Sequence, residues 1–239
     1  MTDDPLADNT GTAAMESLYP FLYAQTSDLP AVLEEVRAST IAKTTEITGL
    51  RQVIAARDGA RIARCAREMA ARFAAGGRLF AFGNGGSATD AAQLATLFLH
   101  PAGLSSGEAA PPLPAFGLAN DTSVVTALCN DIGVDVVFAR QLGAFGRAGD
   151  IAVGLSTSGN SDNLLRAFDE ASRRGMLTIG LAGYEGGKMA ELSSIDYLFV
   201  APSASIHRIQ EAQTTIYQVL WELTAQEVSH VSRDTGSSR

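Results

Sequence analysis

The sequence is poor in the residue types that most often bind metals or form disulfides. Its 239 residues include only two cysteines and three histidines. The two cysteines, Cys65 and Cys129, do not have the spacing of a metal-binding pair. We therefore expect a reduced, cytoplasmic protein.

The sequence also has no apolar run long enough to span a membrane. Residues 1–16 are polar and acidic and do not resemble a signal peptide, so we expect residues 1–18 to form a disordered tail and residues 229–239 to fray. Basic residues are outnumbered, with 18 Lys and Arg against 26 Asp and Glu and a net charge of -8. Direct binding to nucleic acid is therefore not expected.

Two short polar turns carry the strongest functional signal. They are Gly83-Asn84-Gly85-Gly86-Ser87 and Ser156-Thr157-Ser158-Gly159-Asn160-Ser161, and each follows an apolar run and precedes a helical pattern. A strand that leads through such a turn into a helix presents free backbone N–H groups, and serine hydroxyls add further donors. These neutral donors can bind an anion despite the negative net charge, so the turns predict a phosphorylated small molecule as the ligand.

Two helical patterns, at about residues 30–53 and 58–75, precede any strand, and we assign residues 19–76 to an N-terminal helical segment. One sheet cannot easily cover both helices. They are expected to pack against copies of themselves in an oligomer, although solvent-facing amphipathic helices are the alternative.

From residue 77 to 228, strand and helix patterns alternate. The strand candidates are continuous apolar runs, which is typical of a parallel sheet that is buried on both faces. The fold class predicted is α/β, a three-layer doubly wound sandwich with a five-stranded parallel sheet. Ligands in this architecture bind beyond the carboxyl ends of the strands, where both turns fall. The expected strands are Leu79–Gly83, Pro114–Ala119, Ile151–Leu155, Leu177–Leu181 and Tyr197–Ala201.

Better-known phosphate-binding patterns fit the two turns less well. The first turn matches the loose dinucleotide pattern G-x-G-x-x-A, but the next strand ends about one residue short of Asp121 and follows a long loop. No Gly-Lys-Ser/Thr follows either turn, which excludes a Walker-type loop. The glycines alone could be explained by the tight backbone geometry of a turn. That explanation does not account for the serine and threonine hydroxyls of the second turn.

Together with Gly186-Gly187-Lys188-Met189-Ala190 and Arg208-Ile209-Gln210-Glu211, the turns resemble the sugar isomerase (SIS) domain. The closest resemblance is to the phosphoheptose isomerases, which convert sedoheptulose 7-phosphate, and to the similar DnaA initiator-associating protein. This resemblance covers roughly residues 30–227. It implies a flavodoxin-like sheet and a homo-oligomer, tetramer or dimer, with ligand sites near subunit boundaries.

The resemblance also implies a sugar-phosphate site. Ser156, Thr157, Ser158 and Ser161 would hold the phosphate. Contacts to the rest of the sugar would come from Asn84, Gly85, Gly86, Ser87, Asn130, Asp131 and Gln210. A local helix-terminating turn at Asn130-Asp131 and an interface role for Gln210 are the alternatives.

The metal-binding and acid–base residues of the family isomerases are not present at the corresponding positions of this chain. Those enzymes place a His and a Glu four residues apart after the first turn, and a further His on the last helix, to bind a metal and move protons. The corresponding residues here are Gln93, Leu97 and Gln218. The catalytic residues stay unknown, and no metal or cofactor is expected.

The sequence therefore predicts a sugar-phosphate-binding protein that acts as a binding or regulatory module, with a possible protein partner. The alternative is a metal-independent ketose/aldose phosphate isomerase that uses His207 or a carboxylate such as Glu211 or Asp90.

Overall fold

The computed structural model describes residues 29–101, 103 and 110–236. The chain divides into two compact units, residues 1–45 and 46–239, and each is described by itself. The predicted tail at residues 1–18 lies outside the described residues, as do the next ten residues of the predicted helical segment.

Five parallel strands form one sheet in the order β2-β1-β3-β4-β5. Every residue of β1, β3 and β4 is buried, as the continuous apolar runs predicted. The predicted α/β class with a five-stranded parallel sheet is confirmed. The strands are β1 (Leu79–Gly83), β2 (Ala115–Gly117), β3 (Ile151–Ser156), β4 (Leu177–Gly183) and β5 (Tyr197–Ala201).

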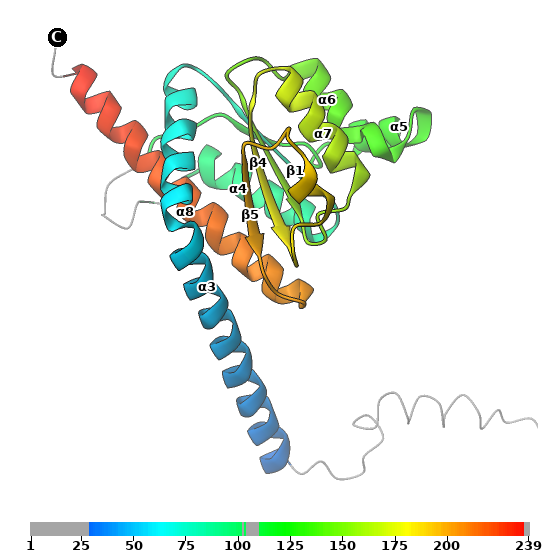
Figure 1. Ribbon diagram of the computed structural model, residues 1–239, viewed down its shortest axis with the longest axis vertical. Coiled ribbons are helices and arrows are strands. Elements are labelled where there is room, and N and C mark those ends of the chain that lie inside the picture. The colour runs from blue at the N-terminus through cyan, green and yellow to red at the C-terminus, as the bar shows by residue number, and fades with distance from the viewer. Residues whose placement is uncertain (1–28, 102, 104–109, 237–239) are drawn as a thin grey trace, which may run out of the picture. The chain divides into compact units, whose positions relative to one another are not determined.

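Helices cover both faces of this sheet and make it the middle of three layers (Figure 1). One face packs against α4 and α8 and against the second half of α3, in a core that includes Phe98 and Tyr217. The other face packs against α6 and α7 around Phe138 and Phe168. The helices of the described chain are α3 (Leu29–Ala74), α4 (Gly86–Leu99), α5 (Thr122–Asp131), α6 (Val137–Phe145), α7 (Asp162–Arg173) and α8 (Ile206–Gly236), with short 3-10 turns η1 (Val134–Val136) and η2 (Gly187–Glu191).

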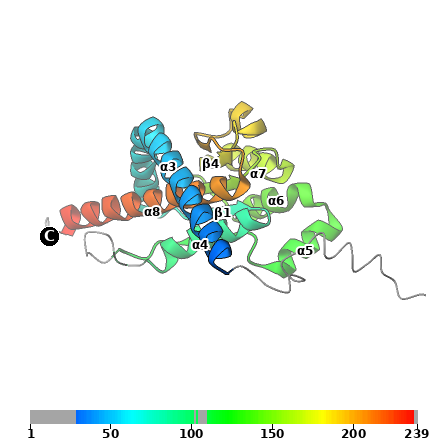
Figure 2. The same cartoon turned by 90° about the horizontal axis from the view of Figure 1, so that it is seen from below.

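The two predicted leading helices are one continuous helix, α3 (Figure 2). The second helix was expected to begin at about residue 58, but the Asp58 carboxylate is buried within a continuous helix and pairs with Arg57 and Arg61. Neutralised in this way, Asp58 does not end the helix. The prediction of two helices was wrong at this point.

The same two arginines reach the free edge of β5. Arg57 donates to the carbonyl of Val200, and Arg61 donates to the carbonyl of Leu198 over 3.1 Å. The Arg61 guanidinium also lies over the ring of Phe199, 5.3 Å from its centroid. The second half of α3 therefore covers this sheet edge with charged side chains.

The last helix runs to Gly236, beyond the predicted end at Glu227. Thr224, Ala225 and Val228 are buried, so the helix keeps a buried face up to Val228, one residue beyond its predicted end. Among the helices of the described chain, none combines the length and apolar character that crossing a membrane requires.

Candidate functional site

The first turn connects β1 to α4 at the carboxyl edge of the sheet. Gly85 adopts a left-handed φ of 54°, and the N–H of Ser87 donates to the carbonyl of Asn84 over 3.0 Å. Ser87 itself is buried. Within the described residues, the N–H groups of Gly85 and Gly86 have no hydrogen-bond partner, so they are free to bind an anion.

The second turn connects β3 to α7 at the same edge. The Ser156 hydroxyl accepts from the N–H of Gly159 over 3.0 Å, and the Ser158 hydroxyl accepts from the N–H of Asn160 over 3.2 Å. The Ser156 and Ser161 hydroxyl oxygens are 3.3 Å apart. Two amides of the turn are thus occupied by its own serines, but an accepting hydroxyl keeps its own proton to donate.

An amide pair joins the two turns. Asn84 and Asn163 each donate through the side-chain nitrogen to the other's side-chain oxygen, both over 2.9 Å. Asn163 is buried on the first turn of α7 and was not singled out from the sequence. Because β1 and β3 flank the point where the strand order reverses, this pair lies where doubly wound sheets bind ligands.

The last helix adds two glutamines to the same region. The side-chain amide of Gln210 lies against Gly86 so closely that a Cβ at position 86 would collide with it. Gln213 is fully buried and donates to the carbonyl of Ser156 over 3.4 Å. The Gln213 side-chain oxygen is buried without a hydrogen-bond partner among the described residues. Sequence reasoning found Gln210 but missed Gln213, because Gln213 is one of several polar residues in this helix and no motif marks it.

Asn130 and Asp131 are the last two residues of α5, an element other than the two turns. Helix α5 begins after its N-cap Asp121, whose carboxylate accepts from the N–H of Val124 over 3.1 Å. Asn130 is nine residues further along, which is ~13 Å down the helix axis. Its amide donates to the Asp131 carboxylate over 2.8 Å, and both side chains are exposed. A role for this pair in the site stays a prediction.

Three titratable residues lie near the first turn of α8 or α4. His207 is exposed and shares a helix face with Gln210 and Glu211, at spacings of three and four residues. The Glu211 carboxylate pairs with Arg208 over 2.8 Å. Burial raises the pKa of Asp90, on α4, above its usual value. Because Glu211 is paired with Arg208, His207 is the more available of these two residues of α8 for proton transfer.

The residues at the family's expected metal and acid–base positions offer a poor set of metal ligands. Gln93, Leu97 and Gln218 supply neutral amides and one aliphatic chain, whereas zinc sites use imidazole, thiolate or carboxylate. The described residues hold no group of three or more His, Cys, Asp or Glu side chains that could bind a metal ion. These residues do not fit a zinc site.

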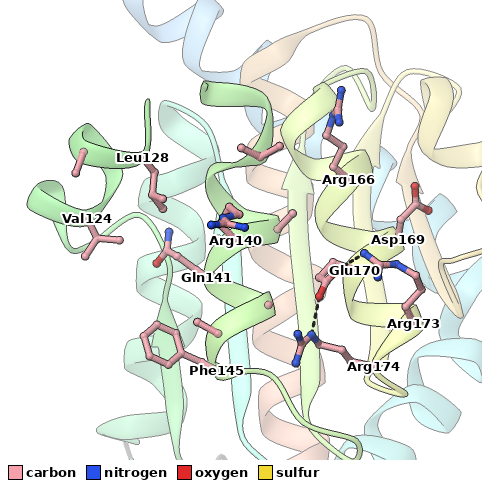
Figure 3. Close-up of a pocket in the computed structure, with 15 residues that line it drawn as sticks. Val124, Leu128, Arg140, Gln141, Phe145, Arg166, Asp169, Glu170, Arg173 and Arg174 are labelled. Carbon is pink, nitrogen blue, oxygen red and sulfur yellow. Dashed lines mark hydrogen bonds and ion pairs between the residues drawn. The ribbon is translucent and has the colours of Figure 1, made fainter. Parts of the chain in front are cut away.

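A groove of about 1060 Å³ lies outside both turns, over α5, α6 and α7 (Figure 3). Arg140, Arg166, Arg173 and Arg174 project into it beside Glu170. Glu170 pairs with both Arg173 and Arg174, and no residue of either turn lines the groove. The groove is a feature of the α6–α7 pair and is separate from the predicted sugar-phosphate site.

The SIS domain model matches residues 44–183. A phosphoheptose isomerase from Pelodictyon phaeoclathratiforme is 45% identical over 174 residues, which are 73% of this chain and 81% of that protein. A phosphoheptose isomerase from Nitratidesulfovibrio vulgaris is 41% identical over 80% of this chain and 89% of its own length. The structure of a phosphoheptose isomerase from Neisseria gonorrhoeae superposes with a TM-score of 0.70 at 34% identity, covering 79% of this chain and 98% of that one.

Sequence, fold and the position of the two turns thus agree with the resemblance expected from the motifs. The chain belongs to the SIS domain family, among relatives that include the phosphoheptose isomerases.

Proposed function

We propose that the chain binds a phosphorylated sugar with the serine turn, residues 156–161, and the glycine turn, residues 83–87. The observation that supports this most is the Asn84–Asn163 pair, which fixes the two turns to each other where the strand order reverses. Unpartnered N–H groups at Gly85, Gly86, Ser158 and Ser161, together with the serine hydroxyls, would surround a phosphate monoester.

We further propose that the bound sugar phosphate is isomerised between its ketose and aldose forms. The identity to phosphoheptose isomerases over most of their length supports this reaction better than binding alone. The reaction takes a proton from the carbon beside the carbonyl, while the carbonyl oxygen gains a proton, to give an enediol. The proton is then returned to the neighbouring carbon as the other hydroxyl oxygen loses its proton and becomes the new carbonyl. The chain must therefore supply a group that both accepts and donates a proton.

His207 is the residue we assign to that step. It lies one helical turn before Glu211 and on the same face as Gln210, whose amide lies against the glycine turn. An imidazole has one nitrogen that can accept a proton and can then donate it back, which suits this step. The amides at positions 93 and 218 give no reason to route this step through zinc.

An isomerisation assay with sedoheptulose 7-phosphate tests this proposal. We expect turnover that survives treatment with a chelator and falls by roughly 10²–10⁴-fold in His207→Ala, as loss of a general acid–base does. Gln218→Ala, at one of the positions that hold the metal in the resembling enzymes, should keep most of the activity. Turnover that needs added zinc, or that is unchanged in His207→Ala, would contradict the assignment.

The second candidate is a binding or regulatory module without turnover, which could also have a protein partner. The glutamines and leucine at the family's metal and acid–base positions favour it. Binding of sedoheptulose 7-phosphate by calorimetry, without turnover in wild-type protein under any metal condition, would select this function. We place either activity in the cytoplasm, because Cys65 and Cys129 are free thiols.

We also propose that the protein works as a homo-oligomer, a tetramer or dimer. Between α3 and α8, a small apolar groove of about 150 Å³ is lined by residues such as Ile54, Ile62 and Leu223. In the other unit, exposed apolar side chains follow the start of α3, at Leu29, Val32, Leu33, Val36 and Ile41. Both surfaces would be covered by another copy of the chain.

Light scattering on the full chain checks the oligomeric state. We expect a mass of two or four chains, and we expect Leu33→Glu with Val36→Glu to lower it, because charges would replace apolar contacts. Glu34→Gln with Glu35→Gln, at neighbouring exposed positions, is the control. A monomeric mass for wild-type protein at micromolar concentration would contradict the proposal.

A further inference from the structure

Tyr184, the first residue after β4, has an unusual backbone. Its φ of 52° is the left-handed conformation, and among the described residues no other side-chain-bearing residue has a positive φ. The other residues with positive φ in the described chain are glycines. A residue with a Cβ adopts this conformation at a cost that glycine or asparagine largely avoids, so such outliers suggest a functional role.

The turn that contains Tyr184 is fixed against the serine turn. The N–H of Gly183 donates to the carbonyl of Thr157 over 3.0 Å, and the N–H of Met189 donates to the carbonyl of Gly159 over 3.0 Å. The N–H of Lys188 donates to the side-chain oxygen of Asn160 over 2.9 Å. Three hydrogen bonds therefore hold the residues on both sides of Tyr184 to the proposed phosphate-binding segment.

The Tyr184 side chain is not part of the core. It is 40% exposed, and its hydroxyl has no hydrogen-bond partner among the described residues. Packing within the unit therefore does not explain why a large aromatic residue occupies a position that favours glycine. An exposed ring on a turn that is hydrogen-bonded to the serine turn can cover the apolar C–H face of a sugar, and its hydroxyl can bond to a sugar oxygen.

We infer that Tyr184 contacts the carbon chain of the phosphorylated sugar and contributes to the choice of sugar. This inference rests on the proposed function, because the phosphate must bind the serine turn for the sugar to reach this ring. The serine turn would hold the phosphate of any such ligand, whereas Tyr184 would act only on the part beyond the phosphate. Tyr184 is a contact residue in this scheme and moves no proton.

Three substitutions separate ligand contact from a role in the turn. Tyr184→Asn removes the ring but suits the left-handed backbone, Tyr184→Gly removes ring and strain together, and Tyr184→Phe keeps the ring. Each full-length variant is titrated by calorimetry with sedoheptulose 7-phosphate and, separately, with inorganic phosphate. Thermal unfolding of each is measured without ligand.

We expect Tyr184→Asn and Tyr184→Gly to bind sedoheptulose 7-phosphate roughly three- to tenfold more weakly, as loss of one aromatic contact would produce. They should bind inorganic phosphate as wild type does and unfold at the same or a higher temperature. Tyr184→Phe should keep most of the affinity for the sugar phosphate.

Equal affinity for sedoheptulose 7-phosphate in wild type, Tyr184→Asn and Tyr184→Gly would overturn the inference and leave the proposed function standing. A parallel loss of affinity for both ligands, or a lower unfolding temperature in Tyr184→Gly, would also overturn it, because either would indicate that Tyr184 supports the turn. A wild-type protein that binds neither ligand would instead refute the proposed function and the inference with it.

Discussion

Replacing Ser156 and Ser158 together with alanine should abolish most binding of a phosphorylated sugar. Each hydroxyl would donate to a charged phosphate oxygen, and the loss of one such hydrogen bond costs roughly 1.5–3 kcal/mol. Two losses correspond to a fall in affinity of about a hundred- to ten-thousandfold, since 1.4 kcal/mol is a factor of ten. The change also leaves the N–H groups of Gly159 and Asn160 without the partners they have in the turn.

Calorimetry with sedoheptulose 7-phosphate measures this effect. Ser172→Ala with Ser193→Ala is the matched control, because both serines are exposed and lie outside the two turns. Circular dichroism should show that the double variant of the serine turn remains folded. An unchanged dissociation constant in Ser156→Ala with Ser158→Ala would refute the assignment of the phosphate to this turn.

Asp150→Ala should lower the free energy of unfolding strongly. Asp150 is buried at the start of β3, at the edge of the sheet opposite the proposed site. Its carboxylate accepts from the N–H of Arg78 and the N–H of Arg147, both over 2.9 Å, and pairs with the Arg78 guanidinium over 2.7 Å. Removing it leaves two backbone donors and a partly buried cation without their acceptor, so we expect a loss of about 3–5 kcal/mol.

Urea unfolding followed by circular dichroism measures the free energy of unfolding. Glu191→Ala is the control, because Glu191 is exposed and its loss should stay within about 0.5 kcal/mol. Affinity for sedoheptulose 7-phosphate at low temperature should not change in the folded Asp150→Ala protein. A loss below about 1 kcal/mol would show that the Arg78 and Arg147 donors find other acceptors.

The sequence predicted the parts of the fold that depend on local pattern. The apolar runs of β1, β3 and β4 and the polar turns after β1 and β3 follow from residues adjacent in the chain, and parallel strands necessarily bring both turns to one edge. The family, too, followed from motifs of this kind. Such features depend on no contact between distant parts of the chain.

Features that depend on distant contacts could not be predicted in this way. Asp58 suggests a helix start unless its pairing with Arg57 and Arg61 is known, and the Asn84–Asn163 bridge joins residues 79 positions apart. Gln213 is one polar residue among several in its helix, and only its hydrogen bond to Ser156 places it beneath the serine turn. The left-handed backbone of Tyr184 has no sequence signal at all, because tyrosine is a poor choice for it.

The arginines of α3 that bind the outer carbonyls of β5 have a consequence for the folding of the chain. An open sheet edge can pair with a strand from another molecule, which is a common route to aggregation. Until α3 has docked, the carbonyls of Leu198 and Val200 are available for such pairing. Since α3 is made before the sheet during synthesis, the cover is ready when β5 emerges from the ribosome, and a chain shortened past Arg61 would lose this protection.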